Sequence, residues 1–146
     1  MNVKTRTTQK LAKLAHTAFV EARRHVEEAR ALVGDLEQEQ RSLGLEREVA
    51  ARARDEAVLG DGASSAQLSL HADHAQWLRR RTATLMNQSR EAEQALERCE
   101  AQLQLALSES KRTDAVHDRA VLEKNAKAAL EEQREQDEYR PGGSRR

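Results

Sequence analysis

Leucine and alanine recur at alternating steps of four and three residues along almost the whole chain, and this spacing constrains the fold more than any other feature. In the first half it selects Leu11, Ala15, Ala18, Ala22, His25, Ala29, Leu32, Leu36, Glu39, Leu43, Glu46, Ala50, Ala53 and Ala57. Such spacing places apolar side chains on one narrow stripe of a helix, as in a coiled coil. A narrow stripe leaves almost no interior for a catalytic pocket. We therefore expect a protein that is not an enzyme and that acts through its outer surface.

One turn-forming segment, Gly60-Asp61-Gly62-Ala63-Ser64-Ser65, interrupts the pattern. The sequence predicts a helix over about 4–59, a turn over about 60–65 and a second helix over about 65–140. Threonines near the start can cap the first helix, and Ser64 or Ser65 can cap the second. Gly34 and Gly44 are expected to be soft points inside the first helix, not breaks. Residues 1–140 are predicted to form a single unit, and residues 141–146 a disordered basic tail.

The second helix carries a stripe of its own, in which most positions are apolar. It comprises Leu68, His71, Ala75, Leu78, Thr82, Leu85, Ser89, Ala92, Leu96, Cys99, Leu103 and Ala106. Beyond Leu107 the register is expected to falter and to be re-phased through Ala115, Leu122, Ala126 and Ala129. The second arm exceeds the first by about twenty residues, or about 30 Å at the rise of an α-helix. The predicted fold class is therefore all-α: an antiparallel two-helix coiled-coil hairpin with a longer, overhanging second helix.

Composition and charge argue against several functional classes. Aromatic residues make up 2% of the chain and charged residues 34%, and the formal net charge is zero. Zero net charge removes the long-range attraction on which nucleic-acid and anionic-membrane binders depend. No run of about 20 apolar residues is present, so we expect a cytoplasmic protein without direct membrane insertion. His71 and His74 lack a clear third ligand for zinc, and we expect no metal and no cofactor.

Apolar residues outside the stripes indicate a first candidate surface near the turn. With Leu43 at heptad position a, Leu45 falls at c and Val49 at g, and with Leu68 at a, Trp77 falls at c. Helical spacing brings these residues to a similar height above the turn. We call the group the turn-side patch: Leu45, Val49, Leu70, His74 and Trp77. It is either a partner site anchored by the single tryptophan or a set of singly exposed apolar residues.

A second candidate surface lies where the two chain ends meet. The part of the first helix before Glu21 contains four basic residues and no acidic one: Lys4, Arg6, Lys10 and Lys13. The overhang of the second helix is rich in charges of both signs. Such a charge run is either a solvated face or a stem that docks into a partner.

Several segments resemble one family. They are Lys10-Leu11-Ala12-Lys13-Leu14, Glu21-Ala22-Arg23-Arg24, Glu27-Glu28-Ala29-Arg30 and Leu130-Glu131-Glu132-Gln133-Arg134-Glu135-Gln136-Asp137-Glu138. Together with the length and the single hairpin, they make nearly the whole chain similar to the FliJ/YscO family, the small cytoplasmic coiled-coil proteins of bacterial type III export. Both flagellar and virulence-associated export systems contain such proteins. Family members often carry several aromatics after the turn, whereas this chain offers Leu70, His74, Trp77 and Leu78 there.

The resemblance implies a non-enzymatic stalk that docks in the hexameric export ATPase, contacts the export gate in the membrane and escorts export chaperones. It implies a cytoplasmic location, peripheral to the inner membrane through the export apparatus. The turn-side patch would meet the gate, and the chain ends would meet the ATPase. We call the latter group the open-end surface: Leu11, Leu14, Leu122, Leu130, Gln133 and Tyr139. Two other functions remain open, a self-associating structural coiled coil and a secretion chaperone. A monomer is the first expectation, and a homodimer is the alternative.

Overall fold

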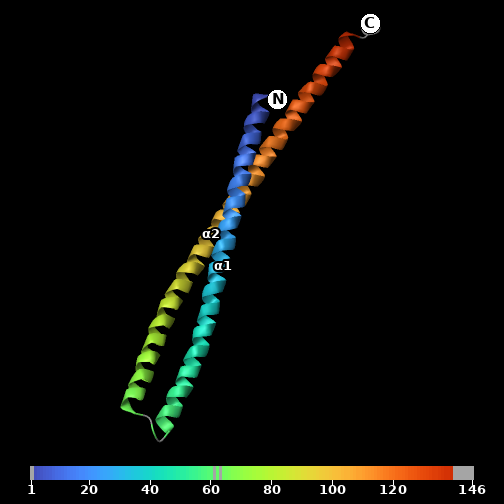
Figure 1. Cartoon of the computed structure of the whole chain (residues 1–146). Helices are drawn as coiled ribbons and strands as arrows, with labels where there is room; N and C mark the ends of the chain where they lie inside the picture. Colours follow the sequence, from blue (N-terminus) through green and yellow to red (C-terminus); the bar gives the residue numbers. More distant parts are fainter. Residues whose placement is uncertain (1, 61, 63, 140–146) are drawn as a thin grey trace. The chain divides into compact units, whose positions relative to one another are not determined.

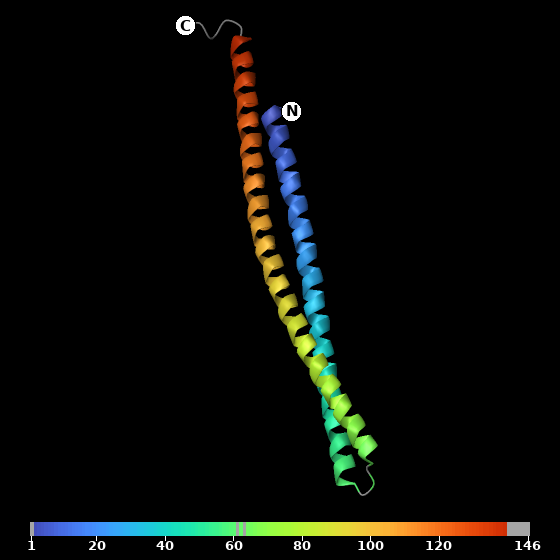
Figure 2. The same cartoon turned by 90° about the vertical axis from the view of Figure 1, so that its left-hand side faces the viewer.

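The computed structural model of the 146-residue chain describes residues 2–60, 62 and 64–139. It contains two α-helices, α1 (Val3–Leu59) and α2 (Ser65–Glu138), which form an antiparallel hairpin with a longer second helix (Figures 1 and 2). The part of the chain so described holds no strand. The predicted tail, residues 141–146, lies outside it. The predicted fold class is therefore confirmed.

Polar side chains fix where both helices begin. The backbone N–H of Thr5 donates to Asn2 Oδ1 at 3.1 Å, so Asn2 caps α1 and the threonines do not. Ser64 caps α2 through a reciprocal pair of bonds, in which Gln67 N–H donates to Ser64 Oγ at 3.2 Å and Ser64 N–H donates to Gln67 Oε1 at 3.3 Å. This arrangement is a capping box, which satisfies two backbone donors at once. Gly34 and Gly44 lie within the unbroken α1, as the sequence predicts.

Contacts divide the chain into two units, each made from a part of both helices. Unit 2 is the hairpin Arg24–Glu100, which includes the turn. Unit 1 joins Met1–Arg23 to Ala101–Arg146, and within it α2 continues past the start of α1 (Figure 2). Residues 125–138 of α2 and Tyr139 directly after the helix are all exposed. They form the overhang that the different helix lengths predict.

The packed stripe of α1 differs from the predicted one at every second position. The stripe consists of Thr5, Thr8, Ala12, Ala15, Phe19, Ala22, Val26, Ala29, Val33, Leu36, Gln40, Leu43, Ala50 and Ala57, all buried or half-buried, and Gln9 beside it is also half-buried. Half of the predicted stripe is correct, from Ala15 and Ala22 to Ala57. The other half is wrong by one residue, since Leu11, Ala18, His25, Leu32 and Glu39 are exposed and the packed side chain is the next one along. The three polar residues that the prediction placed in the α1 stripe therefore face solvent: His25, Glu39 and Glu46.

The stripe of α2 follows the prediction closely from His71 to Ala106. Beyond Ala106 it keeps its phase through Ser110, Thr113, His117, Ala120 and Lys124, so the predicted re-phasing through Ala115, Leu122, Ala126 and Ala129 is wrong. In unit 1 this stretch meets Thr5 and Thr8, both buried. Thr8 Oγ1 lies 2.9 Å from His117 Nδ1 and donates to the Thr5 carbonyl oxygen at 3.0 Å. Burial of the Thr8 hydroxyl is therefore compensated by these partners, whereas Thr5 Oγ1 is buried with no hydrogen-bond partner among the described residues.

The apolar core of unit 2 is a short cluster of leucines. Leu78 is 2% exposed and Leu85 is fully buried, and both pack with Leu43 and the partly buried Leu36 and Ala50. Toward the turn the packing thins, because every described residue from 51 to 70 except Ala57 is exposed. The turn end of the hairpin is therefore held by fewer apolar contacts than its middle.

Candidate partner-binding surfaces

Ion pairs between the helices confirm the corrected register. With Leu43 at position d of α1 and Leu78 at d of α2, Glu46 pairs with His74 at 3.9 Å and Glu39 pairs with Arg81. All four of these residues then fall at g, the position that flanks the seam and carries interhelical charge pairs in coiled coils. Arg30 and Glu100, at 3.7 Å, both fall at e.

The turn-side patch in unit 2 is exposed at all five positions. Trp77 is 51% exposed, and its ring stacks on His74 with centroids 6.1 Å apart and planes inclined by 9°. His74 also reaches Glu46 across the seam, so it links the tryptophan on α2 to the side of α1 that carries Glu46. Such a fixed, half-exposed tryptophan is the kind of side chain that anchors protein interfaces.

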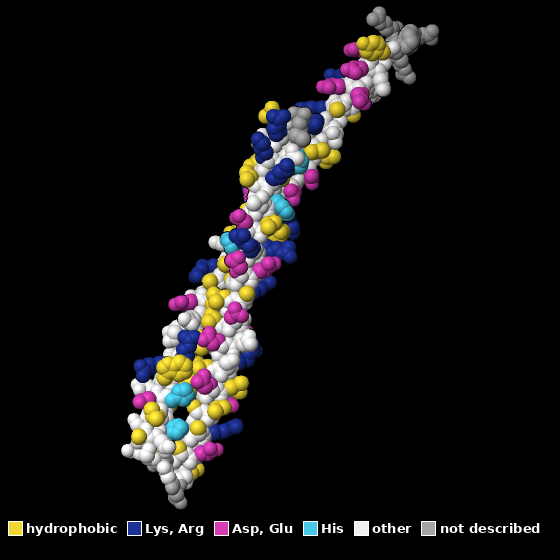
Figure 3. Space-filling model, viewed as in Figure 1, with side chains coloured by type: hydrophobic (Ala, Val, Ile, Leu, Met, Phe, Trp, Pro, Cys, Tyr) yellow, Lys and Arg dark blue, Asp and Glu magenta, His cyan; other side chains and the backbone are white. Residues whose placement is uncertain are grey.

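The corrected register moves the α1 part of the patch outward. Val49 falls at c, about 60° around the helix from Glu46. Leu45 falls at f, on the face of α1 that points away from the seam. On α2, Leu70, His74 and Trp77 keep their predicted positions c, g and c. Val49, Leu70 and Trp77 thus flank the Glu46–His74 pair, and Leu45 extends the patch onto the outer face of α1. Figure 3 shows apolar side chains at the surface of the hairpin among charges of both signs.

The open-end surface belongs to unit 1, and all six of its residues are exposed. Leu11 is 50% exposed and borders a shallow groove that is also lined by Thr8 of α1 and Val116 of α2. Leu122, Leu130 and Gln133 lie within about 80° of one another around α2, at about 100° per residue. Tyr139 lies farther round the helix. The end of α2 therefore presents Leu122, Leu130 and Gln133 on one face, and Tyr139 lies off this face.

Lys4 and Glu123 join the helices close to the start of the overhang. Lys4 Nζ donates to Glu123 Oε2 at 2.7 Å, between two side chains that are each at least half exposed. The hydrogen bond and the charge of Lys4 hold the pKa of Glu123 below its ordinary value of 4.5. A carboxyl group with a pKa lowered by folding stabilises the folded state above its unfolded pKa. The stabilisation is lost as the pH falls through the folded pKa.

We expect a carbon-detected NMR titration to place the midpoint of Glu123 below 4.5 in the native protein and to return it toward 4.5 in Lys4→Met. The matched control is Lys10→Met, which removes an exposed lysine of α1 that does not contribute to this shift. An equal rise in both variants would contradict the pairing and would indicate a general effect of net charge.

Sequence reasoning missed one group of residues. Arg47 and Arg54 occupy positions a of the corrected stripe, between Leu43 and Ala57, and both line a pocket between α1 and α2 in unit 2. The signal was present in the sequence, because steps of four and three from Leu43 lead to Arg47, Ala50, Arg54 and Ala57. The predicted register placed Glu46 and Ala53 there instead.

The part of the chain that the structure describes holds no helix long and apolar enough to cross a membrane and no cluster of metal-ligating side chains. Comparison of the chain with models of known protein families, with curated proteins and with solved structures found no match.

Proposed function

We propose that this protein is a non-enzymatic stalk or adaptor of a bacterial type III protein export apparatus. In this proposal the open-end surface docks in the hexameric export ATPase, and the turn-side patch contacts the export gate. The protein would act in the cytoplasm, held at the inner membrane by these partners, and would also escort export chaperones. The family resemblance of the sequence supplies the identity of the partners.

One structural observation carries the proposal further than any other. In unit 1, the last fourteen residues of α2, 125–138, are all exposed, and so is Tyr139 directly after them. An isolated helical segment of this length is marginal in water, because most helical stability in proteins comes from packing. A helix that extends beyond its partner, exposes Leu130 and is followed by the exposed Tyr139 is suited to pack inside another protein.

The experiment measures ATP hydrolysis by the export ATPase of the same bacterium, titrated with the full chain and with a variant that ends at Lys124. This end point keeps Ala120 and the Lys4–Glu123 pair, so the remaining hairpin stays packed. The full chain is expected to stimulate hydrolysis, and the shortened chain is expected to have lost that effect. Circular dichroism checks that the shortened chain folds. Equal stimulation by both would overturn the docking assignment.

Trp77→Ala provides the matched variant at the other surface. It removes a half-exposed side chain in unit 2 and leaves unit 1 unchanged. We expect it to weaken binding to the cytoplasmic part of the export gate while ATPase stimulation stays at the native level. Loss of both activities together would indicate that the two surfaces do not act separately.

Self-association is the second candidate function, and the exposure of Trp77 beside Val49 and Leu70 is what favours it. Two hairpins that pair through this patch would form a four-helix bundle and would bury the tryptophan. Light scattering separates the two functions. A stable dimer with a blue-shifted Trp77 fluorescence supports the structural role, and a monomer with solvent-exposed Trp77 supports the adaptor.

A further inference from the structure

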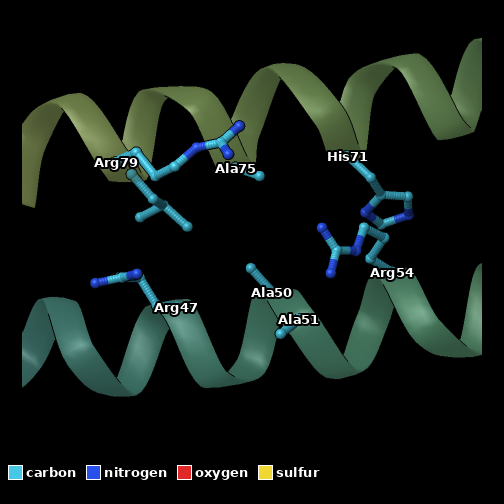
Figure 4. Close-up of a pocket in the computed structure, with 8 residues that line it drawn as sticks. Arg47, Ala50, Ala51, Arg54, His71, Ala75 and Arg79 are labelled. Atoms are coloured by element: carbon cyan, nitrogen blue, oxygen red, sulfur yellow. The ribbon is translucent and has the colours of Figure 1, made fainter.

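A pocket opens between α1 and α2 near the turn end of unit 2. Its volume is about 230 Å³, and each helix supplies four of its lining residues: Arg47, Ala50, Ala51 and Arg54 from α1, and His71, Ala75, Leu78 and Arg79 from α2. In Figure 4 the side chains of Arg54 and His71 extend into the space between the helices at one end, and Arg47 and Arg79 lie at the other end. The alanines lie between these two groups and leave the middle open.

The pocket exists because the seam loses its large apolar side chains at this point. Leu43, Leu78 and Leu85 fill the seam next to the pocket, on the side away from the turn. The next positions of α1 are Arg47, Ala50 and Arg54, and those of α2 toward the turn are Ala75 and His71. Alanine is too short to fill the gap, and a guanidinium group cannot enter an apolar seam without a partner, because burying an unpaired charge is costly.

The pocket has an unbalanced charge. Three guanidinium groups and one imidazole line it, and no carboxylate does. Arg47, Arg54 and Arg79 make no ion pair with any acid among residues 2–60, 62 and 64–139. In the same unit, by contrast, Arg81 pairs with Glu39 and Arg30 pairs with Glu100. Glu46, which precedes Arg47 in α1, does not line the pocket and lies 3.9 Å from His74.

The positively charged side chains on the two sides of the pocket repel one another. An anion bound between them would attract both sides. Guanidinium groups bind oxyanions through pairs of parallel N–H donors, a geometry that suits phosphate. Since a water molecule takes up about 30 Å³ of liquid volume, the space holds a phosphate or diphosphate group with some water, and it does not hold a helix.

From these observations we propose that the pocket binds a phosphate-type oxyanion, with Arg47 and Arg54 of α1 and Arg79 of α2 as its ligands and His71 as a further ring donor. The ligand is a diphosphate group, either free pyrophosphate or the diphosphate of a nucleotide. All three arginines are exposed, so the anion enters directly from solvent. By bridging two helices, it closes the seam where apolar packing ends. The site does not depend on the proposed export function.

Isothermal titration calorimetry of the full chain tests the site, with sodium pyrophosphate and with ADP as probes at constant ionic strength. The test variant is Arg47→Gln combined with Arg54→Gln. The matched control is Arg41→Gln combined with Arg52→Gln, which makes the same change of charge on the same helix at exposed residues outside the pocket. The native chain and the control are expected to bind alike. The test variant is expected to bind at least about tenfold more weakly, because two charge-assisted contacts are lost.

Either source of the diphosphate supports the site. Tighter binding of ADP than of pyrophosphate identifies a nucleotide, and equal binding identifies the free anion. An equal loss of affinity in both double variants would overturn the proposal, since it would reflect net charge alone. NMR of the arginine Nε–Hε signals in the native chain gives a second readout that does not depend on the folding of any variant. Absence of binding, or shifts outside Arg47, Arg54 and Arg79, would also overturn it.

Discussion

Replacement of Leu85 by alanine is expected to lower the free energy of unfolding by about 2 to 4 kcal/mol. Leu85 is fully buried and joins Leu43 and Leu78 in the main apolar cluster of unit 2. The substitution removes apolar area from the seam and leaves a space that two straight helices close only in part. A two-helix seam has no further layer to share the loss, so the effect is large relative to the stability of a small hairpin.

Urea unfolding followed by circular dichroism measures the change. The control is Leu105→Ala, which makes the same chemical change on α2 at a residue that is 71% exposed. Because exposed substitutions shift stability by less than about 0.5 kcal/mol, this variant is expected to unfold like the native chain. Similar losses in both variants would mean that the cluster around Leu85 does not hold unit 2 together.

Replacement of both Arg47 and Arg54 by leucine is expected to raise the free energy of unfolding by about 2 to 3 kcal/mol, since burying a leucine fully contributes about 1.5 to 3 kcal/mol and both sites stay partly open. The two residues stand at seam positions, so the new side chains point into the gap lined by Ala50 and Ala75. The change also removes two of the three facing guanidinium groups. It continues the leucine cluster toward the turn.

Thermal and urea unfolding in phosphate-free buffer test this gain. The control changes Arg41 and Arg52, which are exposed and outside the pocket, to leucine, and no comparable gain is expected there. A loss of stability in the test variant would refute the assignment of positions 47 and 54 to the seam. If the pocket binds diphosphate as proposed, the stabilised variant is expected to have lost that binding as well. The two arginines would then maintain a binding site and lower the stability of the hairpin.

The sequence predicts the packed stripe of α2 more accurately than that of α1. In α2, Leu78 and Leu85 mark position d and Leu96 and Leu103 mark position a, and the predicted stripe is correct from His71 to Ala106. In α1, alanine fills many candidate positions, so steps of four and three from Leu11 and steps of three and four from Ala12 fit almost equally well. The partner helix removes this ambiguity, because only one of the two faces can meet α2. Val26 is buried for this reason and His25 is not.

The polar part of the α2 stripe could not be predicted from the sequence, for a different reason. A search for apolar periodicity passes over Ser110, Thr113 and His117, although these residues continue the stripe of α2 without a change of phase. Two of these side chains have hydrogen-bond partners at short range: Thr113 Oγ1 donates to the carbonyl oxygens of Glu109 and Ser110 at 3.0 Å, and His117 Nδ1 lies 2.9 Å from Thr8 Oγ1. Once its hydroxyl group is hydrogen-bonded, a small side chain such as Thr113 can occupy a seam position, and this cannot be known before the two helices are placed together.

The sequence by itself determined two helices, the turn between them, their antiparallel pairing and the overhang, because periodicity, glycine and helix length are local properties of the chain. The candidate surfaces were also visible in it as exposed apolar residues. Tertiary structure alone decided which side of α1 faces α2, and with it the Glu46–His74 and Glu39–Arg81 pairs and the arginine-lined pocket. These features depend on side chains from two helices at one height, and a register error of one residue turns a helix by about 100°.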